Sequence, residues 1–292
     1  MALREADRRS FLVMVGALLT SSVAAALPAR ADQRAVQFGL TPVFLTNDVE
    51  LLTKLSSYLS RAIGQEVQLV QRRTYEEITS LLLSGQLDAA WICGYPLAQY
   101  LQKLTVVAVP LWRNKPLYQS YLIVPVERKA ENIDDLHGDI HAFSDPNSNS
   151  GYLVTTALLA KRQLRPDQFF KKIIFTYGHR NVVRAVASGL AQSGSVDGYV
   201  WDVMSELEPE LTNKTKIIRK SEELGFPPVA CLRSQISSDT VRRIQTALVG
   251  MKDDPEGRDV LKLLRLDGFA EEPDSLFDTI VAKMQLVKGL GT

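Results

Sequence analysis

Residues 145–152 hold the side chains best suited to bind an anion. They read Asp-Pro-Asn-Ser-Asn-Ser-Gly-Tyr, and they follow a predicted strand and open a predicted helix. Free backbone N–H groups at a helix start point outward, and the helix dipole there favours negative charge. Ser148 and Ser150 can add hydroxyl donors without adding a fixed charge. This composition predicts an oxyanion site, but an ordinary N-cap and turn would have it too, because Ser, Asn and Asp all favour caps.

Cys93 follows a second predicted strand, residues 89–92, at the carboxyl end where ligands bind in open α/β sheets. Its side chain has three alternative interpretations. The first is a small buried residue, since free Cys is among the most buried residue types. The second is a thiol ligand for a soft centre such as trivalent arsenic. The third is a disulfide with Cys231, the other cysteine of the chain.

An enzyme would use Cys93 as a nucleophile and His179 as its base, but no further pattern supports that pairing. The sequence has no zinc-type ligand spacing, no G-x-x-x-x-G-K phosphate loop, no G-x-S-x-G elbow and no G-x-G-x-x-G turn. We therefore expect a binding protein that is not an enzyme, with no catalytic residues, no cofactor and no metal. The thiol of Cys93 stays open as an arsenic ligand.

Short apolar strands alternate with amphipathic helices along the chain. This alternation indicates an α/β fold with two mixed, mostly parallel sheets covered by helices. One set of elements spans residues 35–124 and a second spans residues 140–218, with a strand expected at residues 198–200. Three closing helices, expected to cover the first lobe, span residues 238–251, 255–264 and 275–287.

Two crossings of the chain, near residues 125–129 and 224–228, predict two lobes with a hinge and a cleft between them. Lobe 1 is discontinuous and lobe 2 is continuous. Lobe 1 has residues 32–125 and 228–292, and lobe 2 has residues 126–227.

The first 31 residues have the order of a secretory signal peptide. Arg8 and Arg9 precede a short apolar run, and small residues lead to an expected cleavage after Ala31. The Arg-Arg pair followed by Ser-Phe-Leu resembles a twin-arginine signal. Asp7 stands where that motif usually has Ser, so that Sec export remains an alternative. The apolar run is too short to cross a membrane, and we expect the mature protein in the periplasm.

The charge of the chain is balanced, with 34 Lys and Arg against 33 Asp and Glu and a net charge of +1. A nucleic-acid or anionic-membrane partner would call for a basic surface, which this balance does not provide. We expect a monomer that binds a small molecule.

Three segments occur along the chain in this order: residues 88–91, Asp-Ala-Ala-Trp; residues 145–154, Asp-Pro-Asn-Ser-Asn-Ser-Gly-Tyr-Leu-Val; and residues 178–181, Gly-His-Arg-Asn. Together they resemble the phosphonate/phosphite/phosphate-binding periplasmic proteins of ABC importers, and the spacing agrees over almost all of residues 38–269. The resemblance implies a two-lobed periplasmic binding protein of type II, which closes on its ligand by hinge motion.

The resemblance also implies ligand residues in both lobes. Ser148, Asn149 and Ser150 would grip the oxyanion, and His179 would donate to it. Tyr75 matches an aromatic ligand residue of the first lobe. The family has Thr where this chain has Asn149, whose backbone N–H serves equally. Taken alone, Tyr75 reads as an aromatic residue at a helix start, and His179 as a loop residue that caps the next helix and can switch its charge near neutral pH.

Two departures from the family bear on the ligand. The carboxylates that hold the ammonium group of an aminoalkyl-phosphonate are not matched: one position falls at or beside Pro227, and the other near Trp201, where Asp202 is the candidate. A hydroxyl or aromatic group usually stands where this chain has Cys93, whereas a related group of periplasmic arsenite-sensing proteins uses a cleft cysteine.

The ligands left open are phosphate, phosphite, methylphosphonate, arsenate and arsenite. The function that we predict is capture of a phosphorus oxyanion for an ABC permease. The alternative is an arsenite sensor that uses Cys93 as thiol ligand and signals to a membrane histidine kinase.

Overall fold

The computed structural model describes residues 34–42 and 49–290. The predicted signal peptide, residues 1–31, lies outside these described residues. Within them, no helix is long and apolar enough to cross a membrane.

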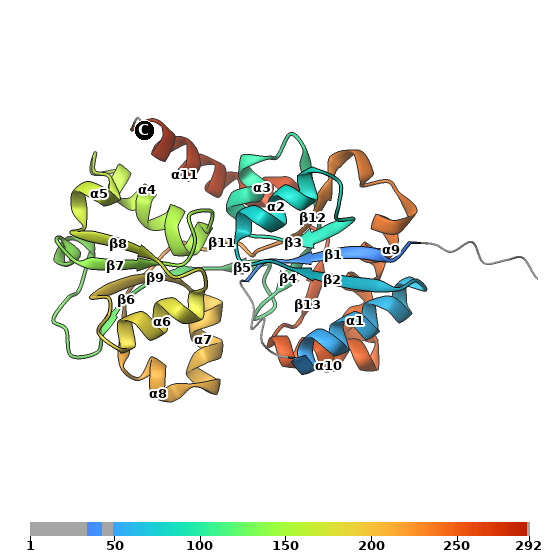
Figure 1. Cartoon of the computed structure of the whole chain (residues 1–292), viewed down its shortest axis with the longest axis horizontal. Coiled ribbons are helices and arrows are strands. Elements are labelled where there is room, and N and C mark those ends of the chain that lie inside the picture. Colours follow the sequence, from blue (N-terminus) through green and yellow to red (C-terminus); the bar gives the residue numbers. More distant parts are fainter. Residues whose placement is uncertain (1–33, 43–48, 291–292) are drawn as a thin grey trace, which may run out of the picture. The chain divides into compact units, whose positions relative to one another are not determined.

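Six strands form the first sheet, in the order β13-β4-β12-β3-β1-β2 (Figure 1). Strand β1 pairs in parallel with β2 and β3, whereas β12 runs antiparallel to β3 and β4, and β13 antiparallel to β4. Figure 1 shows α2 and α3 on one side of this sheet and α1 and α10 on the other. The strands are β1 (Val36–Leu40), β2 (Val67–Gln71), β3 (Ala89–Trp91), β4 (Leu104–Leu111), β12 (Val229–Leu232) and β13 (Gly268–Ala270). The helices are α1 (Val49–Ile63), α2 (Tyr75–Leu83), α3 (Gly94–Gln99), α9 (Asp239–Val249), α10 (Pro255–Leu264) and α11 (Asp278–Lys288).

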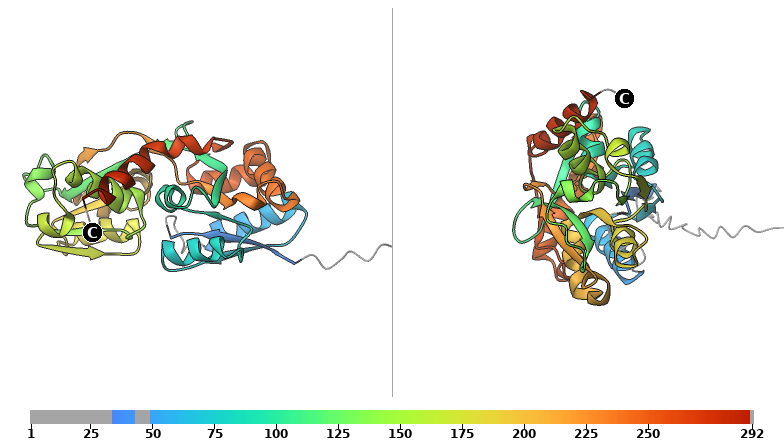
Figure 2. Two further views of the ribbon diagram at one scale, coloured as in Figure 1. Left: turned by 90° about the horizontal axis from the view of Figure 1, so that it is seen from above. Right: turned by 90° about the vertical axis from the view of Figure 1, so that its left-hand side faces the viewer.

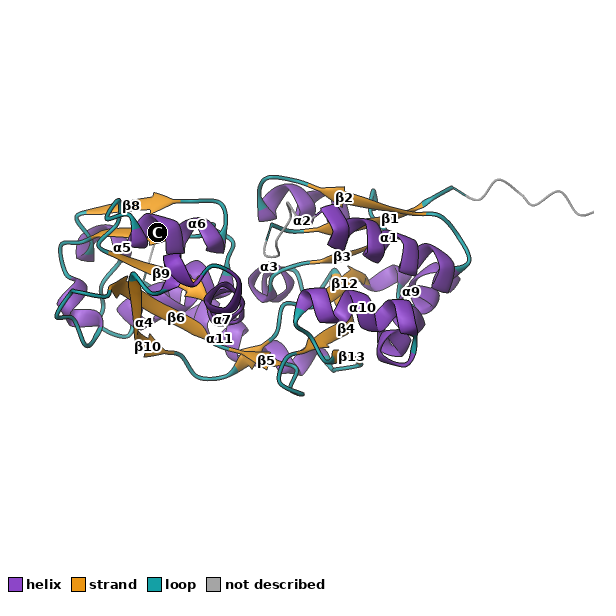
Figure 3. Ribbon diagram, turned by 90° about the horizontal axis from the view of Figure 1, so that it is seen from below, coloured by secondary structure: helices purple, strands orange, loops and turns teal. Residues whose placement is uncertain are grey.

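Five strands form the second sheet, in the order β10-β6-β9-β7-β8. Strand β7 pairs in parallel with β8 and β9, whereas β6 runs antiparallel to β9 and β10. Helices α4 and α5 lie on one side of it and α6, α7 and α8 on the other (Figures 1 and 3). The strands are β6 (Ser120–Pro125), β7 (Ile140–Phe143), β8 (Lys172–Phe175), β9 (Ser193–Asp197) and β10 (Thr215–Lys220). The helices are α4 (Val154–Ala160), α5 (Pro166–Phe169), α6 (His179–Ala187), α7 (Gly198–Leu207) and α8 (Pro209–Thr212), with the π-helical turn η2 (Asn149–Leu153) before α4.

The chain passes between the two sheets at a short antiparallel pair, β5 (Leu117–Tyr118) with β11 (Leu224–Gly225). Short 3-10 turns complete the structure: η1 (Ile133–Leu136), η3 (Arg233–Gln235), η4 (Gly250–Asp253) and η5 (Asp274–Phe277). The sheets are mixed, as predicted, but they are not mostly parallel: of the nine strand pairs described in the two sheets, five are antiparallel. The strands near each crossing run back along their neighbours. The division into lobes at residues 125 and 227 stays a prediction.

Apolar patterning explains why these segments form. Strand β4 is buried along nearly its whole length, as expected for a mostly apolar strand inside a sheet. In α1 the buried residues recur at helical spacing, Leu51, Leu55, Tyr58 and Leu59. In the second sheet the ring of His141 stacks on Phe170, with 4.2 Å between ring centroids. These cores hold the strand ends and helix starts that carry the polar residues described below.

Helix α11 departs from the prediction that the closing helices cover the first lobe. It contacts both α3, which follows the first sheet's strand β3, and α4, which belongs to the second sheet (Figure 2). Phe277 and Ile280 lie so close to Gly94 that a Cβ there would be 2.7 Å from the Ile280 side chain. The C-terminal helix therefore packs on helices of both sheets.

Candidate functional site

The segment predicted to bind an anion forms the π-helical turn η2 (Asn149–Leu153). Ser148 is its N-cap, and the Ser148 Oγ accepts a hydrogen bond of 3.0 Å from the Gly151 N–H. Ser148, Asn149 and Ser150 are all at most 1% exposed. The segment is thus a capped helix start, as one interpretation held. Its hydroxyls are buried inside the protein instead of facing solvent.

Tyr75 and His179 meet although 104 residues separate them. Tyr75 begins α2 after a capping box of Thr74 and Glu77, and His179 begins α6 after Gly178. The Tyr75 hydroxyl lies 3.2 Å from the Nε2 of His179. Both side chains are at most 2% exposed. The two helix starts therefore bring together the two residues that the resemblance selected outside the serine segment.

The protonation state of His179 follows from its partners. The backbone N–H of Asp197 donates to Nδ1 at 3.1 Å, so that Nδ1 carries no proton and the proton of the neutral ring lies on Nε2. Burial lowers the pKa of His179 to about 3. His179 is therefore a neutral donor through Nε2–H. A charge switch near neutral pH is not expected of this buried ring, because burial disfavours its charged form.

Gly151 sets how closely the serine segment approaches His179. A Cβ at this position would lie 1.9 Å from the Ser144 Oγ and 2.9 Å from the His179 Cε1. Distances this short leave no room for any side chain. Glycine at this position is thus what allows the turn η2 to rest against the histidine.

Cys93 also reaches this cluster, as an acceptor. Its Sγ accepts a hydrogen bond of 3.1 Å from the backbone N–H of Asn149, and burial raises the pKa of the thiol to about 12. Cys93 is a buried, neutral thiol. Both cysteines are free, so the disulfide interpretation is wrong. The backbone N–H of Asn149, which we expected to donate to an oxyanion, donates to the Cys93 Sγ in this structure. The Asn149 Nδ2 donates to the Tyr118 hydroxyl at 2.8 Å.

Sequence reasoning missed Asp197, an acidic side chain of this cluster. Its Oδ2 accepts from the Ser150 Oγ at 3.3 Å, and its Oδ1 accepts from the Val200 N–H at 3.3 Å as the N-cap of α7. Burial raises the pKa of Asp197 to about 7. The strand expected at residues 198–200 is wrong: those residues form the first turn of α7, and the strand is β9 (Ser193–Asp197), five residues earlier.

Because the strand was predicted five residues too late, Asp197 was not recognised as a site residue. An acid at the carboxyl end of a strand and the start of a helix is a signal for a site residue, but it is readable only when the strand is placed correctly. The composition of β9, Ser-Gly-Ser-Val-Asp, has little of the β-branched and aromatic content by which strands are found.

The cluster contains neutral donors and no cation. Among the described residues, every Lys and Arg keeps part of its surface exposed, and no group of three or more His, Cys, Asp or Glu could hold a metal ion. Its polar residues are Tyr75, Cys93, Tyr118, Asp145, Ser148, Asn149, Ser150, His179 and Asp197. An oxyanion here would be held by hydrogen bonds alone.

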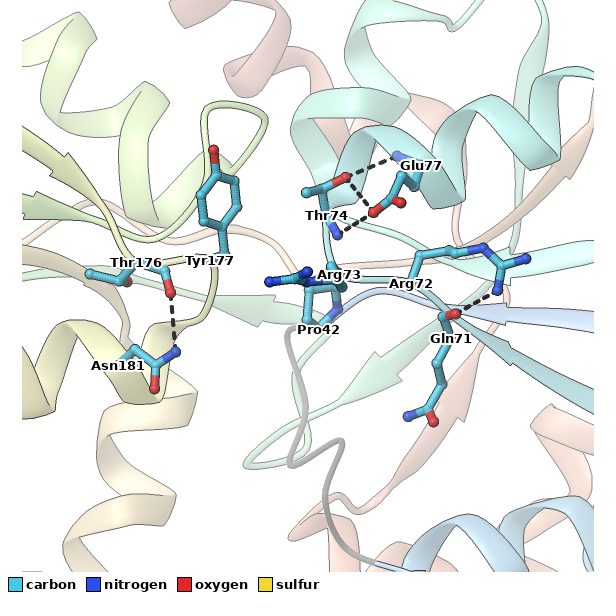
Figure 4. Close-up of a pocket in the computed structure, with 9 residues that line it drawn as sticks. All are labelled: Pro42, Gln71, Arg72, Arg73, Thr74, Glu77, Thr176, Tyr177 and Asn181. Atoms are coloured by element: carbon cyan, nitrogen blue, oxygen red, sulfur yellow. Dashed lines mark hydrogen bonds between the residues drawn. The ribbon is translucent and has the colours of Figure 1, made fainter.

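A cavity of about 850 Å³ lies between the turns that precede α2 and α6, the helices that Tyr75 and His179 begin. It is lined by the turn before α2, including Arg72, Arg73 and Thr74, and by the turn before α6, including Tyr177 (Figure 4). Figure 4 shows Arg73 directed toward the Tyr177 side of the cavity, while Arg72 folds back to donate to the Gln71 carbonyl at 2.7 Å. The charged residues of this lining are two arginines, Arg72 and Arg73, and one acid, Glu77.

A mixed α/β chain with a buried set of hydrogen-bond donors, drawn from both of its sheets, has the features of a solute-binding protein. Residues 38–277 match the sequence model of a protein family, the periplasmic substrate-binding proteins of phosphonate ABC transporters. The chain belongs to this family. Proteins of this family bind a substrate for an ABC transporter in the periplasm and are not enzymes.

Solved structures agree on the fold. A binding component of an ABC phosphonate transporter from Pseudomonas aeruginosa matches with a TM-score of 0.81 at 20% identity, covering 89% of this chain and 88% of that one. PhnD1 from Prochlorococcus marinus, in complex with methylphosphonate, matches with a TM-score of 0.78 at 17% identity, covering 87% and 98%. A Xanthomonas citri protein bound to chloride ion matches with a TM-score of 0.70 at 17% identity, covering 87% and 99%. The predicted two-lobed periplasmic binding protein fold is thereby confirmed.

Proposed function

We propose that this protein captures a small phosphorus oxyanion, of the phosphate, phosphite or simple phosphonate type, in the buried cluster and delivers it to an ABC permease. The observation that carries the proposal is the meeting of neutral donors from distant parts of the chain at one buried point. Ser148 and Ser150 come from η2, His179 from α6 and Tyr75 from α2.

Each donor has a hydrogen that an oxyanion can use. The Ser148 Oγ accepts from the Gly151 N–H, which leaves its own hydrogen for a ligand oxygen. His179 offers Nε2–H, now opposite the Tyr75 hydroxyl at 3.2 Å. A ligand oxygen seated between these two side chains would replace that contact with hydrogen bonds to both, which requires the two helix starts to separate by about the width of an oxygen.

A simple oxyanion fits the charges better than an aminoalkyl-phosphonate. Asp202, the acid nearest to the family's ammonium-binding position, accepts from Arg113 at 3.0 Å and from the Tyr121 hydroxyl at 3.3 Å. It is therefore already paired with a cation and a hydroxyl. With Pro227 at the other position, neither of the two matched positions offers a free carboxylate to hold an ammonium group.

The arsenite alternative gains no support. The thiolate is the form of Cys that binds soft metals and metalloids, and burial keeps the Cys93 thiol protonated. The family match and two of the three structures above are of phosphonate type. Cys93 is better explained as the buried acceptor that fixes the backbone of Asn149.

The proposal also covers the export and the oligomeric state of the protein. We expect residues 1–31 to direct export and to be removed after Ala31, and we expect the exported protein to act as a monomer with its permease. Mass spectrometry of the exported protein would give its first residue, and sedimentation would give its oligomeric state.

Calorimetry with methylphosphonate, phosphite, phosphate, sulfate, arsenite and aminoethylphosphonate tests the function. Methylphosphonate is the first choice because PhnD1, which shares the fold, binds it. Ser148→Ala should weaken binding by about 1–3 kcal/mol, as expected for a hydrogen bond to a charged group. Ser193→Ala is the matched control, since Ser193 is equally buried but bonded to His141 at 2.8 Å. Absence of binding to every phosphorus oxyanion, or arsenite binding alone, would overturn the proposal.

A further inference from the structure

Ser150 has one hydroxyl hydrogen and two places to donate it. In the structure its Oγ lies 3.3 Å from the Oδ2 of Asp197, which accepts this hydrogen when the carboxyl is ionised. A ligand oxygen would compete for the same hydrogen. The Tyr118 hydroxyl is a further hydrogen-bond neighbour of Ser150, and as a neutral phenol it can donate its own hydrogen to the Ser150 Oγ. Ser150 can therefore serve either Asp197 or an oxyanion, but not both.

The Asp197 carboxyl is fixed in place by its second oxygen. Oδ1 accepts from the Val200 N–H at 3.3 Å, and the backbone N–H of Asp197 donates to His179 at 3.1 Å. The residue thus ties β9, α6 and α7 together, and its Oδ2 remains as the atom that faces Ser150. It is 1% exposed, so no bulk water stabilises a charge on it.

The groups around this carboxyl are neutral side chains and two further acids, Asp145, which accepts from the backbone N–H groups of Tyr75 and Asn147, and Asp202, which is paired with Arg113. From η2, α6 and the neighbouring elements they are Ser150, His179, Tyr75, Cys93, Tyr118, Tyr121, Tyr199, Asp145 and Asp202. Burial raises the pKa of the phenols and the thiol and lowers that of His179, which keeps all of them neutral at neutral pH. The ion pair of Arg113 is with Asp202. Within the described residues no cation faces Asp197 to hold it in its ionised form.

We propose that Asp197 couples ligand binding to the uptake of a proton: its protonated Oδ2 donates to the Ser150 Oγ, and the Ser150 hydrogen then turns to an oxygen of the bound oxyanion. The proton comes from solvent, and no other bond forms or breaks. This inference rests on the proposed function of the site. It also explains how a buried site without a cation can accept an anion, since the protein gives up its own negative charge on binding.

The raised pKa of Asp197, about 7, sets the range in which the coupling is visible. Above about pH 7 the free protein holds an ionised Asp197, and binding must bring in a proton. The ligand has acid groups of its own, so the wild type by itself does not isolate the effect. A comparison with a variant that lacks the carboxyl removes the ligand's contribution.

Asp197→Asn is that variant. The amide Oδ1 still accepts from Val200, and its Nδ2–H donates to the Ser150 Oγ at every pH, which mimics the protonated acid. The ratio of the wild-type Kd to the Asp197→Asn Kd for methylphosphonate should be constant below about pH 6 and rise about tenfold per pH unit above about pH 7. Asp239→Asn, which removes an exposed acid from the first turn of α9, should follow the wild type.

Calorimetry in buffers of different ionisation enthalpy counts the protons directly. At about pH 8 the wild type should take up close to one proton more per methylphosphonate bound than Asp197→Asn. Equal proton counts with binding in both proteins would overturn this inference and leave the proposed function standing. No binding by the wild type at any pH would overturn both.

A second variant keeps the test open if Asp197→Asn does not fold. Ser150→Ala removes the hydroxyl that links the carboxyl to the ligand, and it should lose the extra proton uptake while retaining weakened binding. Extra uptake that survives in Ser150→Ala would mean that Asp197 does not act through this hydroxyl, and would overturn the inference.

Discussion

Asp197→Asn should change how the stability of the ligand-free protein depends on pH. Burial raises the pKa of the carboxyl from 3.8 to about 7 in the folded protein, whereas the unfolded chain keeps the ordinary value. Between these values the unfolded state loses a proton that the folded state retains. The free energy of unfolding contributed by Asp197 is therefore fully present below about pH 4 and is lost as the pH rises to about 7.

The size of the effect follows from the same numbers. Each pH unit in this interval removes about 1.4 kcal/mol, and the full interval corresponds to about 4 kcal/mol. Partial entry of water or movement of Ser150 would reduce it, so we expect a loss of about 2–4 kcal/mol. Asn carries no charge at any pH, and the variant should not show this loss.

Urea unfolding of both proteins at pH values from about 4 to about 8 measures it. The stability of Asp197→Asn relative to the wild type should rise through this range and level off above about pH 7. Asp239→Asn, at an exposed helix start, controls for the loss of one negative charge. Parallel curves for the wild type and Asp197→Asn would show that Asp197 titrates normally in the folded protein and would refute the reasoning.

Three further predictions concern the approach to the cluster and its walls. Gly151→Ala should weaken methylphosphonate binding by at least about tenfold in calorimetry, because a Cβ would overlap its neighbours; Gly250→Ala, with no atom within 4 Å, should not. Arg73→Glu should slow association several-fold at low salt in stopped-flow measurements and lose this effect at high salt, whereas Arg258→Glu, outside the cavity, should not. Cys93→Ser should retain binding and lose about 1 kcal/mol of stability, and loss of all binding would contradict a packing role.

The sequence alone determined what depends on neighbours along the chain. Helix starts at Tyr75 and at the serine segment could be predicted because capping and dipole effects act within a few residues. The alternation of apolar strands and amphipathic helices gave the fold class for the same reason, since burial on one face repeats with the period of the element. The family resemblance then selected Ser148, Ser150, His179 and Tyr75, which the structure places in one cluster.

Tertiary structure decided the chemistry of that cluster. His179 is a fixed neutral donor because the backbone N–H of a residue 18 positions later occupies its Nδ1. Cys93 is an acceptor because the turn at Asn149 lies against it, 56 residues away. Such pairings have no local signature, since they depend on how two sheets bring their strand ends together.

The strand β9 shows why Asp197 escaped prediction. Its Gly194 is needed because α6 approaches so closely that a Cβ would lie 2.6 Å from the Val182 side chain. Small residues there satisfy a contact with a distant helix, and the same small residues erase the apolar pattern of a strand. What buried Asp197, and so raised its pKa, was therefore packing between elements, which a linear pattern of residue types does not contain.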